Sequence, residues 1–86
     1  MKIKFHKNFE KRYKTLNNNQ KKKIQERLEL FLDNQFHQIF NNHSLKGKYS
    51  DYRSINIGGD LRAIYKLTIN DECIFVEIGT HNQLYS

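Results

Sequence analysis

Apolar residues recur at helical spacing through the first third of the chain, in two stripes separated by polar residues. The stripes are Phe9, Tyr13 and Leu16, then Ile24, Leu28, Phe31 and Leu32. Spacings of three to four residues place side chains on one helical face, which predicts two amphipathic helices with these residues in the core. The intervening Asn17, Asn18 and Asn19 suit both a helix C-terminus and an N-cap. Residues 2–6 alternate charged and apolar side chains, which predicts a short strand before the first helix.

From residue 52 onward the period of the pattern changes to two, as in strands. Residues 52–57 and 61–68 flank Gly58 and Gly59, and residues 73–79 follow Asn70 and Asp71. Glycine accepts positive φ, so a Gly-Gly pair favours a tight hairpin turn, and Asn-Asp is a second turn signal. The pattern therefore predicts a three-stranded antiparallel meander.

The predicted register separates an apolar from a polar sheet face. A two-residue turn at Asn70-Asp71 places Leu67 opposite Ile74, Tyr65 opposite Val76 and Ala63 opposite Ile78. We expect the helices to cover this face. The opposite face is then free and net basic, with the residues Arg53, Asp60, Arg62, Ile64, Lys66, Phe75 and Glu77.

The predicted fold class is α+β: a short N-terminal strand, two helices, then the meander with both helices on one sheet face. With 86 residues, no proline and no Gly/Ser linker, the chain is expected to form one domain over residues 1–86. Cys73 is the sole cysteine, which excludes an intramolecular disulfide and a cysteine-based zinc site. The lack of a long apolar run or a signal-like N-terminus predicts a soluble, cytoplasmic protein without membrane contact.

The chain is strongly basic, and its charge is unevenly distributed. Fifteen Lys and Arg face nine Asp and Glu, a formal net charge of +6, and ten of the basic residues lie within residues 1–27. Such a field favours polyanions or an acidic partner, although a merely soluble surface explains the composition equally well.

Four short motifs in the second half resemble those of the YafQ branch of the RelE/ParE toxin superfamily. They are His43-Ser44-Leu45-Lys46-Gly47, then Tyr52-Arg53, then Asp60 with Ile64-Tyr65-Lys66-Leu67, and finally Gly79-Thr80-His81 with Leu84-Tyr85. The close resemblance covers residues 42–86, and the first half shares the order of elements. It implies a RelE-like fold and a toxin that cuts translated mRNA in the ribosomal A site. It also implies an acidic antitoxin that covers the toxin surface.

By the resemblance, His43, Asp60 and His81 stand at acid/base positions, Tyr85 at an assisting aromatic position, and Arg62 at a phosphate-binding position. The chemistry agrees: metal-free RNA cleavage needs a base for the 2′-hydroxyl, an acid for the leaving oxygen and fixed positive charge at phosphorus. No metal motif and no cofactor are expected.

Further residues are expected to contact the RNA. Arg53, Lys46, Lys48 and Asn56 are the predicted RNA-binding residues, and the helix lysines either contact ribosomal RNA or only keep the helices soluble. Asn56 stands where the YafQ pattern usually has histidine, and Tyr49 and Tyr85 stand where Trp and Phe are common. Asn56 cannot exchange a proton near neutral pH. The two other histidines, His6 and His37, are expected to lie at the surface.

Other functions stay open. One is a non-enzymatic poison of DNA gyrase, as in ParE members of the superfamily. Another is a catalytically weakened toxin retained as the antitoxin's partner. The antitoxin segment is expected either along the helices or near the basic face.

Overall fold

The computed structural model describes residues 1–85, which form a five-stranded sheet with helices on both sides. Its elements in chain order are β1 (Lys2–Phe5), α1 (Lys7–Thr15), α2 (Asn18–Asp33), the 3-10 turn η1 (Gln38–Phe40), β2 (His43–Ser44), the 3-10 turn η2 (Gly47–Tyr49), β3 (Arg53–Gly58), β4 (Leu61–Leu67), β5 (Glu72–Thr80) and α3 (His81–Tyr85). The strand order is β1-β5-β4-β3-β2, with β1 parallel to β5 and the other neighbours antiparallel. The predicted α+β class and the three-stranded meander β3-β4-β5 are confirmed.

The break between the two long helices is a capping box. The Asn17 side chain accepts a hydrogen bond from the Gln20 amide at 2.8 Å, and the Asn17 amide donates to the Gln20 side chain at 3.0 Å. These two bonds satisfy amides that the first turn of α2 leaves unpaired. Asn17 is therefore the N-cap of α2, whereas α1 ends at Thr15 with Leu16 as its C-cap, so the break between the helices lies where the sequence predicts it.

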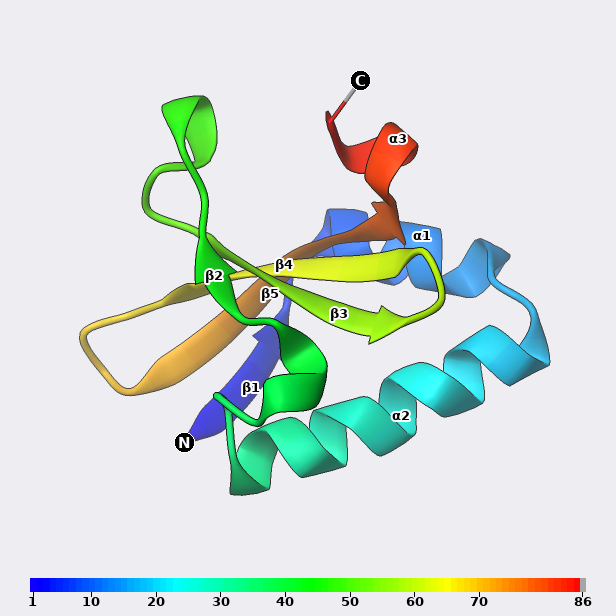
Figure 1. Cartoon of the computed structure of the whole chain (residues 1–86), viewed down its shortest axis with the longest axis horizontal. Helices are drawn as coiled ribbons and strands as arrows, with labels where there is room; N and C mark the ends of the chain where they lie inside the picture. Colours follow the sequence, from blue (N-terminus) through cyan, green and yellow to red (C-terminus); the bar gives the residue numbers. More distant parts are fainter. Residues whose placement is uncertain (86) are drawn as a thin grey trace.

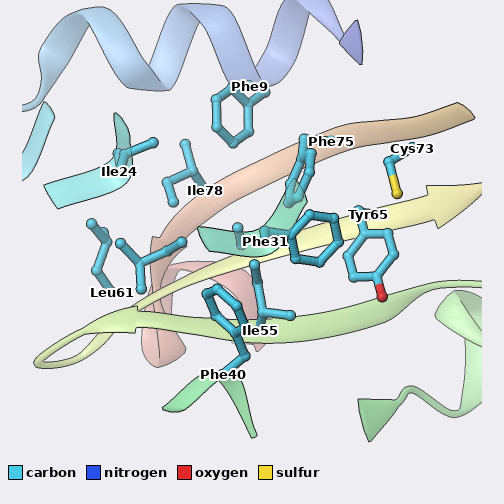
Figure 2. Close-up of a cluster of buried hydrophobic side chains, with 12 residues drawn as sticks. Phe9, Ile24, Phe31, Phe40, Ile55, Leu61, Tyr65, Cys73, Phe75 and Ile78 are labelled. Carbon is cyan, nitrogen blue, oxygen red and sulfur yellow. The ribbon is translucent and has the colours of Figure 1, made fainter. Parts of the chain in front are cut away.

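The core lies between the sheet and the helices α1 and α2, and aromatic rings fill it (Figure 2). The Phe31 ring of α2 lies edge-on to three others, with centroid distances of 5.8 Å to Phe40, 5.1 Å to Tyr65 and 5.4 Å to Phe75. Phe9 of α1 reaches the same cluster through Phe75. Edge-to-face contacts stabilise the core in addition to the burial of large apolar rings, so this cluster holds the helices against the sheet.

The β4–β5 register differs from the predicted one by a residue over half its length. The loop is three residues long rather than two, because the Thr68 amide bonds to the Glu72 carbonyl and Asp71 takes a φ of 58°. Tyr65 consequently pairs with Phe75, whereas a bulge at Val76 restores the predicted pairing of Ala63 with Ile78. Phe75 therefore faces the core and is fully buried, which corrects its predicted place on the free face.

The first hairpin also turns one residue later than predicted. Gly58 still pairs with Leu61, so the two-residue loop is Gly59-Asp60 rather than Gly58-Gly59. Gly59 has a φ of +56°, the left-handed conformation that favours glycine. The turn places Asp60 at an exposed tip.

The sheet face opposite α1 and α2 is not bare. Figure 1 shows α2 below the sheet, whereas α3 and η2 rise on the other side. Ile64 on this face is fully buried, and α3 packs against β5. The prediction that no helix covers this face is therefore wrong for the end of the sheet beneath α3.

Candidate active site

A cavity of about 360 Å³ opens on the sheet face opposite the two long helices. Its lining comes from the segment around β2, from β3, β4 and α3, with the residues Asn41, His43, Leu45, Ser54, Asn56, Arg62, His81 and Tyr85. The register explains the gathering, because His43 pairs with Ser54 and Asn56 pairs with Arg62, and residues opposite one another share a face. These described lining residues include two imidazoles, one guanidinium and no carboxylate, so the cavity favours an anion.

A capping box fixes α3, which carries two of the cavity residues. The Thr80 amide donates to the Gln83 side chain at 2.9 Å, and the Gln83 amide donates to the Thr80 hydroxyl at 3.2 Å. Gly79 makes room, since a Cβ there would lie 2.9 Å from Gln83 Oε1. One turn of helix then places the His81 and Tyr85 rings 4.9 Å apart.

The protonation of the His43 ring follows from its hydrogen bond. Nδ1 lies 2.8 Å from the carbonyl oxygen of Asn41, which can only accept, so Nδ1 carries the proton and donates it. In the neutral ring the other nitrogen, Nε2, is then an unprotonated acceptor. His43 is an exposed residue, so its ring is not buried in the core.

Arg53 lies on the other face of the sheet, which corrects its predicted place beside Arg62. It pairs with Tyr65, whose ring is in the core, because the alternation of β3 sends residues 53 and 55 to that side. Its Nε donates to Asn42 Oδ1 at 2.7 Å, and its guanidinium lies 5.3 Å from the Phe36 ring centroid. Asn42 in turn donates to the Tyr65 hydroxyl at 2.7 Å. Arg53 thus closes one edge of the core.

Tyr65, which lies at the edge of the core that Arg53 closes, is fully buried. Burial raises the pKa of the Tyr65 hydroxyl above its ordinary value, and the hydrogen bond with Asn42 lowers it in part. The Tyr65 hydroxyl therefore stays protonated near neutral pH. Its hydrogen bond with Asn42 belongs to the core and not to the cavity.

Asp60 lies apart from the cavity that holds the histidines. It borders a second hollow, of about 520 Å³, between the β3–β4 turn and the start of α2, together with Lys23 and Arg27. Its position at the loop tip follows from the Gly59-Asp60 turn. The structure therefore does not bring Asp60 together with His43 and His81.

The two predicted lysines lie on the loop that follows β2. Lys46 precedes η2 and Lys48 lies within it, and both are exposed. Leu45, their neighbour in sequence, lines the cavity. The lysines therefore stand beside the cavity rather than inside it.

Sequence reasoning missed three lining residues, Asn41, Leu45 and Ser54. For Ser54 a signal was present, because Ser54 and Asn56 alternate with Ile55 and Ile57 and must share the polar face of β3. The histidines without a motif, His6 and His37, instead cap α1 and η1 through Nδ1. Within residues 1–85, no three His, Cys, Asp or Glu side chains gather as metal ligands would.

The fold and the cavity together define a small α+β domain with an anion-favouring, imidazole-lined site on one sheet face. A family of proteins with the description "Bacterial toxin of type II toxin-antitoxin system, YafQ" matches residues 1–86. The chain therefore belongs to the YafQ family of type II toxins, as its motifs suggest. No curated protein matches it.

Solved structures of related toxins share the fold. YafQ from E. coli strain BL21(DE3) is 24% identical, with a TM-score of 0.83 and coverage of 98% of this chain and 97% of that chain. An E. coli DinJ-YafQ complex is likewise 24% identical, with a TM-score of 0.69 and coverage of 98% and 97%. The RelE-RelB complex of Pyrococcus horikoshii OT3 is 19% identical, with a TM-score of 0.75 and coverage of 95% and 96%. At these identities the likeness concerns the fold. None of the helices in the described part of the chain is long and apolar enough to cross a membrane.

Proposed function

We propose that this toxin is a metal-independent endoribonuclease that cuts mRNA in the ribosomal A site. The observation that carries the proposal is the convergence of His43, Arg62 and His81 on one cavity, from three separate elements. Two imidazoles for proton transfer and one fixed positive charge are the set that metal-free RNA cleavage requires.

The hydrogen bond of His43 supports a role as the general base. With Nδ1–H donated to the Asn41 carbonyl, Nε2 of His43 accepts the proton of the ribose 2′-hydroxyl. The 2′-oxygen then bonds to phosphorus, and the bond from phosphorus to the 5′-oxygen breaks. His81, when protonated, gives its proton to that 5′-oxygen, and Arg62 binds the phosphate oxygens. The products are a 2′,3′-cyclic phosphate and a 5′-hydroxyl.

The test is cleavage of mRNA by the purified protein in a translating ribosome mixture. We expect cuts within codons, and a loss of roughly a hundred- to ten-thousand-fold in rate for His43→Ala and for His81→Ala. The double variant His81→Ala/Arg62→Ala should not cut. His6→Asn, which keeps a cap at α1, and Lys66→Ala, which removes an exposed cation from β4, are the matched controls. If the double variant cuts as well as the wild type, the site is wrong.

The catalytic role of Asp60 stays a prediction. The position of Asp60 at the other hollow argues against this role. Because Asp60 borders the other hollow, we expect Asp60→Asn to slow cleavage far less than His81→Ala. Expression of the toxin without antitoxin in cells distinguishes the alternatives. Intact mRNA with inhibited gyrase would favour a ParE-like poison, and unimpeded growth at full expression would favour a weakened toxin.

An acidic antitoxin is the partner that we propose for the helix side of the molecule. An apolar groove of about 260 Å³ lies between α1 and α2, lined by Phe5, Phe9, Glu10, Tyr13, Ile24, Gln25 and Leu28. These two helices carry eight Lys and Arg against four Asp and Glu. Apolar side chains on an acidic segment would fill the groove while its carboxylates meet the lysines. The complexes of YafQ with DinJ and of RelE with RelB support a partner of this kind.

Co-purification of the co-expressed toxin and cognate antitoxin tests this docking site. Leu28→Gln alters the groove, whereas Leu32→Gln makes the same change on the same helix at an exposed position outside it. We expect only Leu28→Gln to reduce capture, with thermal melting as the check on folding. Capture that instead depends on Lys46 and Lys48 would place the antitoxin on the basic side of the cavity.

A further inference from the structure

Two hydrogen-bond donors are buried without a partner, and both border the candidate active site. Among residues 1–85, the buried side-chain nitrogen and oxygen atoms that lack any hydrogen-bond partner are Ser54 Oγ and Arg62 Nη1. Ser54 is 0% exposed. Folded proteins pair nearly all buried polar groups, because an unpaired one keeps the full cost of its lost hydration. Both unpaired atoms belong to residues that line one cavity. This indicates a ligand in the cavity that accepts hydrogen bonds from them.

The register explains why one ligand would meet both donors. Ser54 pairs with Ile64, and Arg62 lies two residues before Ile64 on the same strand, so the two side chains are diagonal neighbours on one face. Such neighbours lie within reach of a long side chain or of a small bridging group. Ser54 also pairs with His43, on its other side. Ser54 thus lies on β3 between the strand that carries His43 and the strand that carries Arg62.

The chemistry of the two donors selects the ligand. A guanidinium only donates and carries a positive charge, and the Ser54 hydroxyl can donate to the same group, so a negatively charged acceptor suits both. A tetrahedral phosphate presents several such oxygens and fits a cavity of about 360 Å³. Because the described lining has no carboxylate, no anionic side chain competes with it there.

We propose that Ser54 Oγ and Arg62 Nη1 form a two-donor phosphate-binding seat at the floor of this cavity. Its use in RNA cleavage rests on the ribonuclease function proposed above. The seat would hold a nonbridging oxygen of the RNA phosphate beside His43, so Ser54 is a phosphate-binding residue. Free inorganic phosphate has the same oxygens and binds the same seat.

Ser54→Ala tests the seat with a signature that a structural serine cannot give. Removing a hydroxyl that no protein group pairs should leave the melting temperature without phosphate unchanged or higher. In wild type, inorganic phosphate at constant ionic strength should raise the melting temperature, with sodium acetate as the anion control. In Ser54→Ala this rise should shrink, with phosphate affinity reduced about 10- to 100-fold, the value of one hydrogen bond to a charged group. Ser44→Ala, an exposed serine on β2, is the matched control.

Three results would overturn the seat. The first is that phosphate stabilises Ser54→Ala as much as wild type, and the second is that acetate stabilises wild type as much as phosphate does. The third is a clearly lower melting temperature of Ser54→Ala than of wild type without phosphate. The last would show that the hydroxyl has a structural partner. RNA cleavage is measured separately on the same variants. Phosphate binding that depends on Ser54 in a protein that cuts no RNA would refute the ribonuclease function and leave the seat. Unchanged cleavage and phosphate binding in Ser54→Ala, with an active wild type, would refute the seat alone.

Discussion

Asn56 occupies the cavity position at which the YafQ motif usually has a histidine. It pairs with Arg62 across β3 and β4 and lines the same cavity as His43 and His81. A carboxamide donates and accepts hydrogen bonds but does not exchange a proton near neutral pH. The proposed reaction therefore has two imidazoles where the motif usually provides three.

Replacing Asn56 with histidine should increase the rate of mRNA cleavage. General acid–base groups contribute roughly a hundred- to ten-thousand-fold, and a third imidazole recovering part of this should give a gain of about tenfold. The measurement is kcat in the ribosome assay for wild type, Asn56→His and the amide-preserving control Asn56→Gln. A folded Asn56→His protein with no gain would mean that the two present imidazoles already complete the proton transfers.

The place of a single residue in the cavity is predictable from the sequence where a motif contains it. It is less predictable where only the strand register decides which face the side chain is on. His43, Arg62, His81 and Tyr85 were named from short motifs, and they line one cavity. The predicted place of Arg53 on the free face is wrong because it depends on a Gly58-Gly59 turn, whereas the observed register pairs Arg53 with Tyr65 on the core side. Ser54 is not among the predicted site residues, although its alternation with Ile55 and Ile57 places it on the polar face of β3.

The short helix α3 decides where two of the cavity residues lie. The spacing Thr80-x-x-Gln83 is a capping-box pattern, and both of its hydrogen bonds are present. The sequence contains this signal, although the apolar pattern alone predicts no helix after residue 79. A five-residue helix has little stability of its own, so the cap and the packing on β5 must hold it.

Gln83→Ala should therefore lower cleavage although it removes no group from the cavity lining. Loss of the cap costs about 1 kcal/mol of local stability, which releases His81 and Tyr85 from their fixed positions. Hydrogen exchange should become faster in α3 and stay unchanged in β4, and kcat should fall severalfold. Asn82→Ala, at an exposed position of the same helix, is the control. Faster exchange without loss of activity would show that α3 need not be rigid.

The strand β5 shows why register is harder to predict than strands. Its existence followed from alternation, but a three-residue loop and the bulge at Val76 each shift the phase by one residue. The two shifts cancel at Ile78, so the predicted pairing is correct for the half of the ladder near the cavity and wrong for the half near the loop. A bulge leaves no mark in a hydrophobic pattern, since Phe75 and Val76 are both apolar.

For the whole molecule, the arrangement of charge makes the two sheet faces different, and each face suits one of the two ligands proposed above. The helices α1 and α2 carry eight cationic side chains, and an apolar groove lies between them, which suits an amphipathic acidic segment. The other face has the imidazole-lined cavity with Lys46 and Lys48 beside it, which suits a polar, flexible RNA strand. Figure 1 shows that the sheet separates α2 from η2 and α3. The composition alone, at a net charge of +6, did not distinguish these two surfaces.

The salt dependence of RNA binding separates the two faces experimentally. Each phosphate of a single strand that a cation neutralises contributes a slope of roughly 0.7 in log affinity against log salt. If Lys46 and Lys48 contact the RNA, Lys46→Gln/Lys48→Gln should reduce the slope for a single-stranded oligonucleotide by roughly 1.4. Lys14→Gln/Lys22→Gln removes the same charge from exposed positions of α1 and α2, so it is the matched control.

Because both double variants lose the same net charge, a general electrostatic effect would change the two slopes equally. A contact with the RNA backbone changes only the slope of the variant whose lysines touch it. A larger reduction in Lys14→Gln/Lys22→Gln would instead place the RNA along the helices. The acidic antitoxin and the RNA would then compete for one surface, and binding of the antitoxin segment to the groove would itself displace the RNA.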